Sequence, residues 1–426
     1  MYLSQSAGLH GTITVPGDKS ISHRAVMLGA LADGDTHITD FLMGEDCLST
    51  IDCFRRMGVQ IETTEHEVFV RGVGLHGLKQ PDTALYTGNS GTTTRLLCGI
   101  LAGQAFPVQI SGDASIQKRP MGRIMTPLRQ MGADISGINQ NYCPLKIHPV
   151  PSLRGISYTL PVASAQLKSA ILLAGLYADS PTHIIEPAPS RDHTERMLRA
   201  LGAEVQSEGN QVTLIPPKNL LAKDISVPAD ISSAAFFLVA ASIVPNSEIT
   251  IQNVGINPTR TGILDALRDM GADITIFNHH DDAEPVCDLT ARSAKLHGTT
   301  IAGEIIPRLI DELPILAVAA AFAEGQTIIR DAQELKVKES NRIAVMVSEL
   351  SKAGAKVRET EDGMVIDGGH PLHGASFASF NDHRVAMSMA VCALGCEGQS
   401  DILNPEITAI SYPDFFDTLK KLEGKM

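Results

Sequence analysis

The sequence lacks any apolar stretch long enough to cross a membrane. No run reaches the roughly 18 to 20 uncharged residues that a spanning helix needs. The first residues, MYLSQSAGLHG, also lack a basic region followed by an apolar stretch, which is the pattern of an export signal. We therefore expect a cytoplasmic protein that does not act at a membrane.

The chain also lacks an excess of positive charge. Its 35 Lys and Arg residues stand against 48 Asp and Glu residues, which gives a formal net charge of -13. Because nucleic acids and anionic lipids are bound by basic surfaces, this balance argues against both as partners. An anionic ligand would have to be met by a local cluster of cations.

The cysteines show no pattern of pairing. Their number is odd, and the two that are nearest in sequence, Cys392 and Cys396, lie inside an apolar, helix-like run. We expect buried, reduced thiols rather than a disulfide or metal site. A polar cluster, NHHDDAE, could instead bind a metal through His279, His280, Asp281 and Asp282, but it reads as a loop between strands. No metal and no other cofactor is assigned.

Nucleotide-binding motifs are absent or incomplete. The segment GVGLHG, residues 72–77, matches the pattern G-x-G-x-x-G, but LKQPD follows it where the fingerprint requires a helix. It is predicted to be a turn. No G-x-x-x-x-G-K-[ST] segment occurs, so the phosphate-cradling loop of the nucleotide hydrolases is missing.

A helical run that ends in a glycine turn and a short strand recurs along the chain. A residue without Cβ suits the left-handed conformation that often follows a helix. The recurring glycines, at intervals of about 70 to 80 residues, are Gly58, Gly132, Gly202, Gly271 and Gly354. A last copy is cut short in LKKLEGKM.

A second element, a long Ala/Leu/Val-rich helix followed by a β-rich segment, recurs six times in step with the first. The halves also match directly, since TVPGDKS at 14–20 corresponds to SVPADIS at 226–232. We predict an α/β (α+β) fold of two similar lobes, each with three helix-strand-helix-strand units. The first lobe would hold 16–227. The second would hold 1–15 and 228–426, so that the strand LHGTITV gains a partner.

Polar and basic residues gather where the apolar helices start. In GDKSISHR, Lys19 and Arg24 lie in the first two turns of a helix, where the dipole and the free N–H groups disfavour cations and attract anions. For Asp230, Ser232 and Ser233 ordinary N-capping is the favoured explanation, but capping explains neither basic residue. If the repeats stack with common polarity, the helix starts share one face and form an anion site.

The chain resembles the family of 5-enolpyruvylshikimate-3-phosphate synthases. The motifs that carry the resemblance run in order over nearly the whole chain: GDKSISHR, GNSGTTTRL, QKRP, PVASAQLKSA, SRDHTERML, IDELP, KVKESNR and NDHR. Three of them, GNSGTTTRL, ASAQ and RDHTE, look like the class II branch. The resemblance implies the inverse α/β barrel of the enolpyruvyl transferases, in which helices lie inside each lobe and sheets lie outside.

The resemblance also implies a reaction between two small molecules, shikimate 3-phosphate and phosphoenolpyruvate. The 5-hydroxyl of the first adds to the enol carbon of the second, and phosphate then leaves without a covalent enzyme intermediate. Both substrates carry a phosphate and a carboxylate, which suits the basic helix starts. We expect a monomer that binds the substrates in order, with hinges near Pro16 and Pro228.

Matched motif by motif, the resemblance implies two sets of substrate contacts. For shikimate 3-phosphate they are Lys19, Ser20, Arg24, Ser164, Ala165, Gln166, Arg191, Asp311 and Lys338. For phosphoenolpyruvate they are Lys19, Gly91, Arg119, Gln166, Arg342 and Arg384. Gly91 leaves room that a bulkier residue would deny.

The implied catalytic residues are Asp311, Glu339 and Lys19. Asp311 fits the proton acceptor for the 5-hydroxyl, and Glu339 fits its partner in protonating the methylene carbon. Without the family, Asp311 could be the N-cap of the helix that includes Pro314, and Glu339 could simply pair with Arg342. The chain departs from many relatives at Glu334 and near Ile410, where an asparagine and a lysine would contact substrate.

Two other functions remain compatible with the repeat. A non-catalytic sensor of phosphorylated metabolites would need the basic residues but neither Asp311 nor Glu339. A sugar-nucleotide transferase of the related UDP-N-acetylglucosamine family would need a cysteine on a mobile loop, and the comparable stretch SIQKRPMGR has none.

Overall fold

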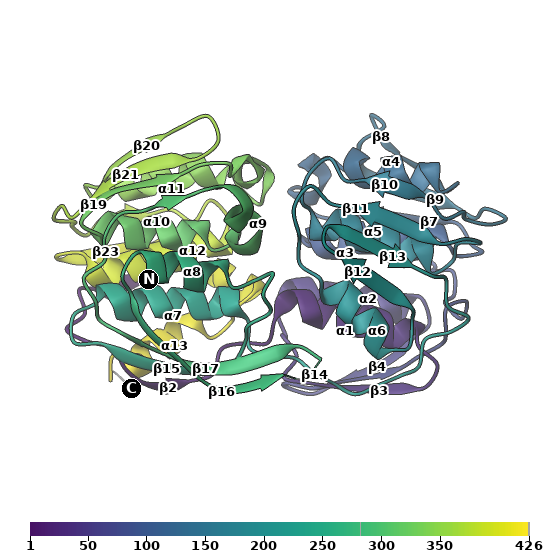
Figure 1. Cartoon of the computed structure of the whole chain (residues 1–426), viewed down its shortest axis with the longest axis horizontal. Coiled ribbons are helices and arrows are strands. Elements are labelled where there is room, and N and C mark those ends of the chain that lie inside the picture. Colours follow the sequence, from purple (N-terminus) through teal and green to yellow (C-terminus); the bar gives the residue numbers. More distant parts are fainter. Residues whose placement is uncertain (282, 425–426) are drawn as a thin grey trace. The chain divides into compact units, whose positions relative to one another are not determined.

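The computed structural model describes residues 1–281 and 283–424 and divides into two compact units. Unit 1 comprises Met1–Pro16 and Pro228–Met426, and unit 2 comprises Gly17–Val227. The chain therefore passes between the units twice, after Pro16 and after Val227. The boundary predicted from the sequence had assigned Pro16 to the other lobe. Figure 1 shows the elements of both units.

The described residues form six sheets, three in each unit, that share one topology. In β6-β7-β9-β8, the first two strands are parallel, and β9 pairs antiparallel with both β7 and β8. Four other sheets repeat this order, and the sheet β22-β23-β1 repeats its first three positions, with β1 antiparallel to β23. This is the sixfold repeat predicted from the sequence, in a mixed helix and strand fold.

Unit 2 contains the first three repeats. Its helices are α1 (Lys19–Leu31), α2 (Glu45–Arg56), α3 (Gly91–Ala102), η1 (Ile116–Lys118), α4 (Gly122–Gln130), α5 (Ala165–Gly175) and α6 (His193–Ala200). Its strands are β3 (Asp35–Thr39), β4 (Gln60–Thr63), β5 (Val68–Arg71), β6 (Leu85–Tyr86), β7 (Val108–Ser111), β8 (Asp134–Ile138), β9 (Tyr142–His148), β10 (Ser157–Thr159), β11 (Thr182–Ile185), β12 (Val205–Glu208), β13 (Gln211–Leu214) and β14 (Ile225–Ser226).

Unit 1 contains the other three repeats and the first strands of the chain. Its helices are α7 (Ile231–Ile243), α8 (Gly262–Asp269), η2 (Gly303–Ile305), α9 (Ile306–Leu309), α10 (Leu313–Phe322), η3 (Gln333–Val337), α11 (Arg342–Lys352), α12 (His383–Gly395), η4 (Pro405–Ile410) and α13 (Phe415–Leu422). Its strands are β1 (Tyr2–Ser4), β2 (His10–Ile13), β15 (Glu248–Gly255), β16 (Asp273–Asp281), β17 (Pro285–Arg292), β18 (Thr300–Ile301), β19 (Gly325–Ile329), β20 (Lys356–Glu359), β21 (Met364–Gly368), β22 (Ser376–Phe377) and β23 (Gln399–Ile402).

The first strand segment finds its partner in unit 1. β2, which lies in the predicted strand LHGTITV, pairs in parallel with β15, from His10 opposite Glu248 to Ile13 opposite Ile251. Without β2, the sheet β16-β17-β15 would lack the parallel edge strand that each equivalent sheet has. The N-terminal segment therefore completes the first repeat of unit 1.

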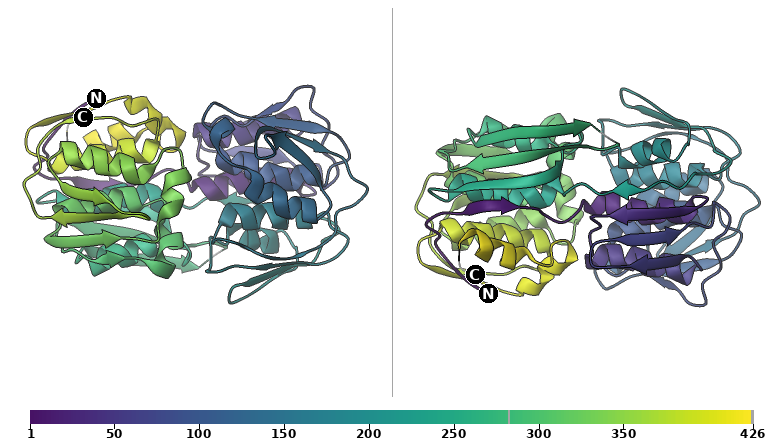
Figure 2. Two further views of the ribbon diagram at one scale, coloured as in Figure 1. Left: turned by 90° about the horizontal axis from the view of Figure 1, so that it is seen from above. Right: turned by 90° about the horizontal axis from the view of Figure 1, so that it is seen from below.

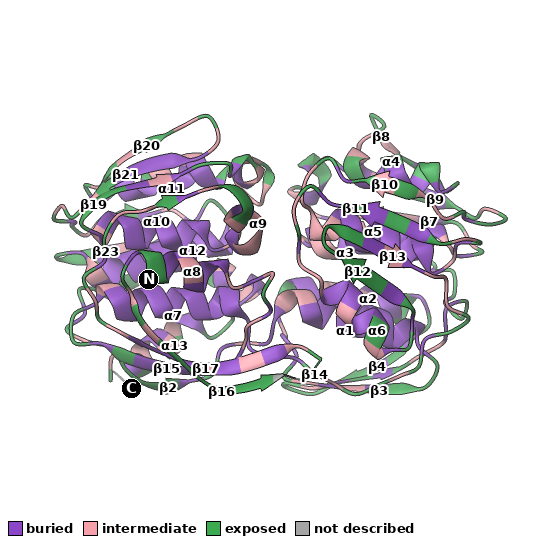
Figure 3. Cartoon of the chain, in the orientation of Figure 1, coloured by how far each residue is buried: buried purple, intermediate pink, exposed green. Residues whose placement is uncertain are grey.

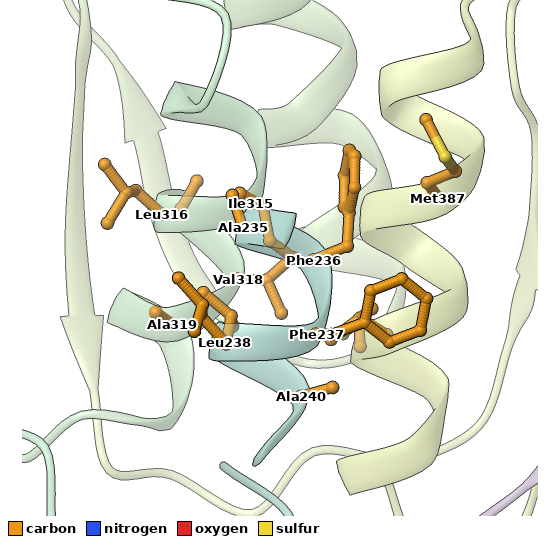
Figure 4. Close-up of a cluster of buried hydrophobic side chains, with 14 of the residues drawn as sticks. Ala235, Phe236, Phe237, Leu238, Ala240, Ile315, Leu316, Val318, Ala319 and Met387 are labelled. Carbon is orange, nitrogen blue, oxygen red and sulfur yellow. The ribbon is translucent and has the colours of Figure 1, made fainter. Parts of the chain in front are cut away.

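Each unit has its own apolar core, built around three helices that are buried on nearly all sides. In unit 1, α7 has the sequence ISSAAFFLVAASI and is buried over Ile231 to Ser242. A helix that is apolar all round is stable only when other elements surround it. Figure 4 shows Phe236 and Phe237 of α7 with Val318 of α10 and Met387 of α12. Figures 2 and 3 show the sheets and amphipathic helices around these buried helices.

The glycine turns have the backbone conformation that the sequence predicts. Each of the five glycines has a positive φ, between +85° at Gly271 and +100° at Gly132, and Gly424 in the shortened last copy has φ +67°. L-residues with a Cβ rarely adopt this region. No described helix combines the length and the apolar character needed to span a membrane.

Candidate active site

The buried helices of unit 2 begin with capped first turns. Asp18 Oδ1 accepts a hydrogen bond from the Ile21 N–H at 2.9 Å, and Ser90 and Ser164 cap α3 and α5 in the same way. Each cap satisfies a backbone donor that the helix leaves without a partner. Lys19 and Arg24, by contrast, cap no backbone N–H group, and their charged groups contact side chains of other helices.

Lys19 is balanced by two acidic residues, Asp18 at the start of its own helix and Asp46 in the first turn of α2. Its Nζ lies 3.1 Å from Asp46 Oδ2, and the two side chains are 16% and 10% exposed. The Asp18 cap adds a second negative charge at the same helix end, which offsets the repulsion between the lysine and the helix dipole. Sequence reasoning missed Asp46, because its only signal is an acidic residue in the first turn of α2.

Arg24 is buried among hydroxyl groups. Its Nε donates to Thr194 Oγ1 at 2.6 Å, its Nη2 donates to Ser169 Oγ at 2.7 Å, and its Nη1 donates to the Ser20 carbonyl at 2.9 Å. Thr194 lies on α6 and Ser169 on α5, so three helices hold one guanidinium. The motif SRDHTERML contains Thr194, but its role as a partner of Arg24 is visible only in three dimensions.

The starts of α3 and α5 are joined through Gln166. Its Oε1 accepts from Arg95 Nη1 at 2.5 Å, and its Nε2 donates to Thr92 Oγ1 at 3.0 Å. A Cβ on Gly91 would lie 3.0 Å from Arg95 Nη1 and 3.1 Å from Arg119 Nη1. A glycine at this position therefore lets two guanidinium groups approach the N-terminus of α3.

Arg119 is held against the same helix start. Its Nη2 donates to Asn89 Oδ1 at 2.7 Å and to Ser115 Oγ at 3.0 Å, and the residue is 7% exposed. Five other predicted contacts in unit 2 are only half-buried, which leaves part of each side chain reachable by a ligand: Ser20, Ser164, Ala165, Gln166 and Arg191.

A buried polar chain links the helices beneath these residues. His23 Nδ1 lies 2.7 Å from Thr50 Oγ1, which lies 2.7 Å from Thr93 Oγ1, and Thr93 donates to Ser90 Oγ at 2.7 Å. Burial, with the nearby positive charges of Lys19 and Arg24, holds the pKa of His23 well below its usual value. The imidazole is therefore neutral at physiological pH.

In unit 1, Asp311 lies at the centre of the predicted residues. Its Oδ1 is 3.3 Å from Lys338 Nζ and 3.2 Å from Arg342 Nη1, and its main-chain oxygen accepts from Arg384 Nη1 at 3.1 Å. The N-cap position of α10 is Glu312, so the alternative in which Asp311 caps this helix is wrong. The carboxylate of Asp311 faces cations instead.

Arg342 connects both predicted acid–base residues to a third carboxylate. Its Nη2 lies 2.5 Å from Glu339 Oε2 and its Nε lies 2.9 Å from Asp382 Oδ2, while its side chain is 1% exposed. Burial disfavours the charged guanidinium, but Asp382, Glu339 and Asp311 outweigh that cost and raise its pKa further above the ordinary arginine value. Arg342 is therefore a permanent cation beside Asp311 and Glu339.

A second buried network joins the starts of α7, α10 and α12. Ser232 donates its hydroxyl to Glu312 Oε1, and Arg384 Nη1 lies 3.8 Å from the same oxygen. Arg260 Nη2 donates to Asp230 Oδ1 at 2.9 Å and to Ser232 Oγ at 2.8 Å. Asp230 is the N-cap of α7, as favoured from the sequence, whereas the Ser232 hydroxyl serves the network rather than the cap.

Within each unit, the starts of the three buried helices are linked by the contacts above. Of the predicted residues, Arg119 follows η1, Arg191 precedes α6, and Lys338, Glu339 and Arg342 lie just before or at the start of α11, whereas the others lie at the starts of the buried helices. Unit 2 carries Lys19, Ser20, Arg24, Gly91, Arg119, Ser164, Ala165, Gln166 and Arg191. Unit 1 carries Asp311, Lys338, Glu339, Arg342 and Arg384.

The alternative metal cluster does not lie on a loop. His279 and His280 belong to β16, so the prediction of a loop there was wrong, and Asp282 lies outside the described residues. Among residues 1–281 and 283–424, no group of three or more His, Cys, Asp or Glu side chains is placed to hold a metal ion.

The cysteines are buried and reduced, as the sequence predicts. Burial raises the pKa of the Cys53 thiol to about 12 and that of Cys143 to about 11. Burial, and then the nearby Cys143, also raise the pKa of the Cys98 thiol. Such thiols are poor nucleophiles and fit a packing role.

Comparisons with known proteins agree over nearly the whole chain. A family model described as EPSP synthase (3-phosphoshikimate 1-carboxyvinyltransferase) matches residues 3–419. A 3-phosphoshikimate 1-carboxyvinyltransferase of Thermoanaerobacter sp. (strain X514) is 54% identical over 97% of this chain and 98% of its own. The protein of the same description from Geobacillus thermodenitrificans is 56% identical over 98% of this chain and 97% of its own.

A solved structure of EPSP synthase from Acinetobacter baumannii is similar to the fold described above. It superposes with a TM-score of 0.88 at 47% sequence identity, over 99% of this chain and 98% of the other. This agreement extends the match from the sequence motifs to the fold. The chain belongs to the EPSP synthase (3-phosphoshikimate 1-carboxyvinyltransferase) family.

Proposed function

We propose that the protein transfers the enolpyruvyl group of phosphoenolpyruvate to the 5-hydroxyl of shikimate 3-phosphate and releases phosphate. This is the transferase step that leads toward chorismate and the aromatic amino acids. The observation that carries the proposal is the cluster in unit 1, where Asp311 and Glu339 both contact the buried cation Arg342. A protein that only binds anions needs cations but no acid–base residues, so two carboxylates beside this cation favour an enzyme.

The addition requires two proton transfers, and each of the two carboxylates takes part in one of them. Asp311 accepts the proton of the 5-hydroxyl as its oxygen forms a bond to C2 of phosphoenolpyruvate, and Glu339 takes part in delivering a proton to C3. Lys338 Nζ, 3.3 Å from Asp311 Oδ1, places a positive charge beside this carboxylate. In the second stage the C–O bond to phosphate breaks while C3 loses a proton, which restores the double bond.

The cations bind the anionic groups of both substrates. We assign phosphoenolpyruvate to the residues Lys19, Gly91, Arg119, Gln166, Arg342 and Arg384. We assign shikimate 3-phosphate to Lys19, Ser20, Arg24, Ser164, Ala165, Gln166, Arg191, Asp311 and Lys338. Charged hydrogen bonds contribute roughly 1.5 to 3 kcal/mol each, so loss of Lys19 or Arg119 should weaken substrate binding severely. Lys19 belongs to both sets and also supports the proton transfers.

The proposed substrate contacts lie in both units, so residues of both units must contact the same two substrate molecules. We propose that shikimate 3-phosphate binds first, that its anionic groups offset the repulsion among the cations, and that closure about Pro16 and Pro228 then completes the site. We also propose that the protein acts as a monomer in the cytoplasm. Light scattering after size-exclusion chromatography tests the monomer.

A phosphate-release assay tests the reaction itself. We expect release that requires both shikimate 3-phosphate and phosphoenolpyruvate, with an enolpyruvyl ether as the other product by mass spectrometry. Binding of both compounds without release would support the metabolite sensor instead. Release with UDP-N-acetylglucosamine in place of shikimate 3-phosphate would support the sugar-nucleotide transferase.

A further inference from the structure

A buried ion cluster in unit 2 has no part in the chemistry proposed above. Lys168 Nζ lies 2.8 Å from Glu186 Oε2 and 2.7 Å from Glu195 Oε1, and its side chain is 1% exposed. The three residues come from separate elements: Lys168 from α5, Glu195 from α6, and Glu186 from the position directly after β11. One lysine thus ties together the whole third repeat.

The cluster also fixes the backbone next to Arg191. Lys168 Nζ donates to the Ser190 carbonyl at 3.2 Å, and the Ser190 hydroxyl donates to Glu186 Oε1. Ser190 is buried and directly precedes Arg191, which is half-buried. The Lys168 ammonium group therefore fixes the position of the main chain directly before Arg191.

The neighbours of the same two helix residues hold Arg24. Ser169 follows Lys168 and Thr194 precedes Glu195, and their hydroxyls lie 2.7 Å apart. Both accept hydrogen bonds from the Arg24 guanidinium. The ion pair between α5 and α6 thus lies beside the hydroxyl pair that orients Arg24.

The charges in the cluster are unequal. One lysine faces two carboxylates that are 4% and 1% exposed, and Glu195 Oε2 has no hydrogen-bond partner in the described structure. Such an arrangement is costly to bury, and an apolar cluster of the same size would hold the helices together at less cost. The ion pairs instead fix the positions of α5, α6 and the segment after β11 relative to one another, because charged hydrogen bonds are short and directional.

We propose that Lys168, Glu186 and Glu195 form a positioning cluster that sets Arg24 and Arg191 for the binding of shikimate 3-phosphate. The proposal rests on the proposed function, since it concerns the substrate assigned to those two arginines. The three residues do not touch substrate. They act through Ser190, Ser169 and Thr194, so their loss should affect this substrate and leave phosphoenolpyruvate little changed.

The test compares Lys168→Met with the unchanged protein in steady-state kinetics for each substrate. We expect the KM for shikimate 3-phosphate to rise by about tenfold or more, the KM for phosphoenolpyruvate to change less than about threefold, and Lys168→Arg to recover part of the loss. A merely structural role would lower the melting temperature and the fraction of active enzyme, and neither changes a KM. An unchanged KM for shikimate 3-phosphate would overturn the proposal.

Glu195→Gln covers the case in which Lys168→Met does not fold, because it keeps the shape of the side chain and removes one charge. We expect the same split between the two substrates with a smaller rise, of about threefold, and equal changes in both KM values would overturn the proposal. Lys352→Met in unit 1 is the matched control, since Lys352 also pairs with a buried carboxylate, Glu349, at 2.8 Å. It should leave both KM values unchanged.

The result can be separated from a failure of the proposed function. Binding of shikimate 3-phosphate alone is measured by calorimetry on the same variants. If the unchanged protein binds it but produces no phosphate with phosphoenolpyruvate, the reaction is wrong, and a tenfold loss of binding in Lys168→Met still supports the cluster. If the unchanged protein turns over normally and Lys168→Met binds equally well, the cluster is wrong and the reaction stands.

Discussion

Several of the cations proposed to bind substrate are already paired with carboxylates. Lys19 contacts Asp46, Lys338 contacts Asp311, and Arg342 contacts Asp382 in addition to its other partners. These pairs hold long, flexible side chains in place before a ligand arrives, which reduces the entropy that binding must overcome. At the start of α1, Lys19 is thus paired with a carboxylate, whereas Arg24 donates to hydroxyl and main-chain oxygens.

Asp311→Asn should lower turnover far more than it weakens binding. The amide keeps the size of the side chain but cannot accept the proton of the 5-hydroxyl, so we expect kcat to fall by about 100- to 10,000-fold with KM values within a few-fold. Steady-state phosphate release measures both parameters. Asp367→Asn is the control, because Asp367 is an exposed carboxylate of unit 1 that accepts from Gln326. Unchanged turnover in Asp311→Asn would remove this residue from the mechanism.

His23 should make the stability of the protein depend on pH below about 6.5. Its folded pKa is lowered by burial and by Lys19 and Arg24, so the unfolded chain takes up a proton at a pH where the folded protein does not. Proton uptake by the unfolded state alone lowers stability as the pH falls, with a slope of at most about 1.4 kcal/mol per pH unit for one group. The contribution of His23 to the free energy of unfolding is fully present above about pH 6.5, and it is lost progressively as the pH falls toward the lowered pKa of the folded state.

Urea denaturation of His23→Gln between pH 7.5 and 5 tests this linkage. We expect the variant to be less stable at pH 7.5 but to lose less stability on acidification. The slopes of the free energy of unfolding against pH should differ by at most about 1.4 kcal/mol per pH unit, the value for one proton. His183→Gln is the matched control, since His183 also contacts a threonine hydroxyl, at 2.9 Å, but is exposed. Parallel stability curves for His23→Gln and the unchanged protein would contradict the assignment.

At the scale of the element, one structural unit is used six times with small changes. Each long buried helix starts with polar residues, and each amphipathic helix ends at a glycine with a positive φ. In three copies an arginine near the end of the amphipathic helix donates to the backbone of the following strand: Arg55 to Ile61, Arg129 to Ile135 and Arg199 to Val205. These contacts fix the turn whose geometry the glycine permits.

Gly202→Ala should destabilise the protein through its backbone alone. Gly202 has φ +91°, and a Cβ placed there would meet no atom within 4 Å. The left-handed region costs a residue with a Cβ roughly 1 to 2 kcal/mol, which urea denaturation can resolve. Gly202→Asn should cost less, because asparagine adopts this region more readily. Equal stability of Gly202→Ala and the unchanged protein would show that another conformation is available to this turn.

At the scale of the whole molecule, the connections between the units are few. The chain crosses only after Pro16 and after Val227. A Cβ on Gly17 would lie 2.0 Å from the Asp40 carbonyl, so the first crossing needs glycine for a close backbone approach. Two short connections between two separate cores permit the units to move as bodies.

Binding of shikimate 3-phosphate should therefore reduce the radius of gyration in solution. The contacts proposed for this substrate include cations of both units, so we expect its anionic groups to favour closure and phosphoenolpyruvate to add little further change. Small-angle scattering with each ligand alone and with both measures the effect. Inorganic phosphate at the same ionic strength is the control for screening of charge. No compaction with both substrates present would count against ligand-driven closure.

Much of the fold followed from the sequence. The recurring glycines, the apolar helices and the match between TVPGDKS and SVPADIS predict six repeats, because helix periodicity and turn chemistry are local properties. The grouping of Lys19, Gly91 and Gln166 at helix starts also followed, since a repeat places equivalent positions together. His279 and His280 were assigned wrongly to a loop, because polar residues on an exposed strand have no apolar alternation to reveal them.

The sequence by itself determined the family, the six-unit repeat and the identity of the charged residues at the helix starts. Only the tertiary structure decided how those charges are balanced: that Asp46 pairs with Lys19, that Arg342 joins Asp311 to Asp382, and that Lys168 lies between two glutamates. The reason is that a motif, or one unit of a repeat, is a pattern of residues that lie near each other in the sequence. Charge pairing depends on which distant residues burial brings within about 4 Å of each other, and no local pattern specifies that.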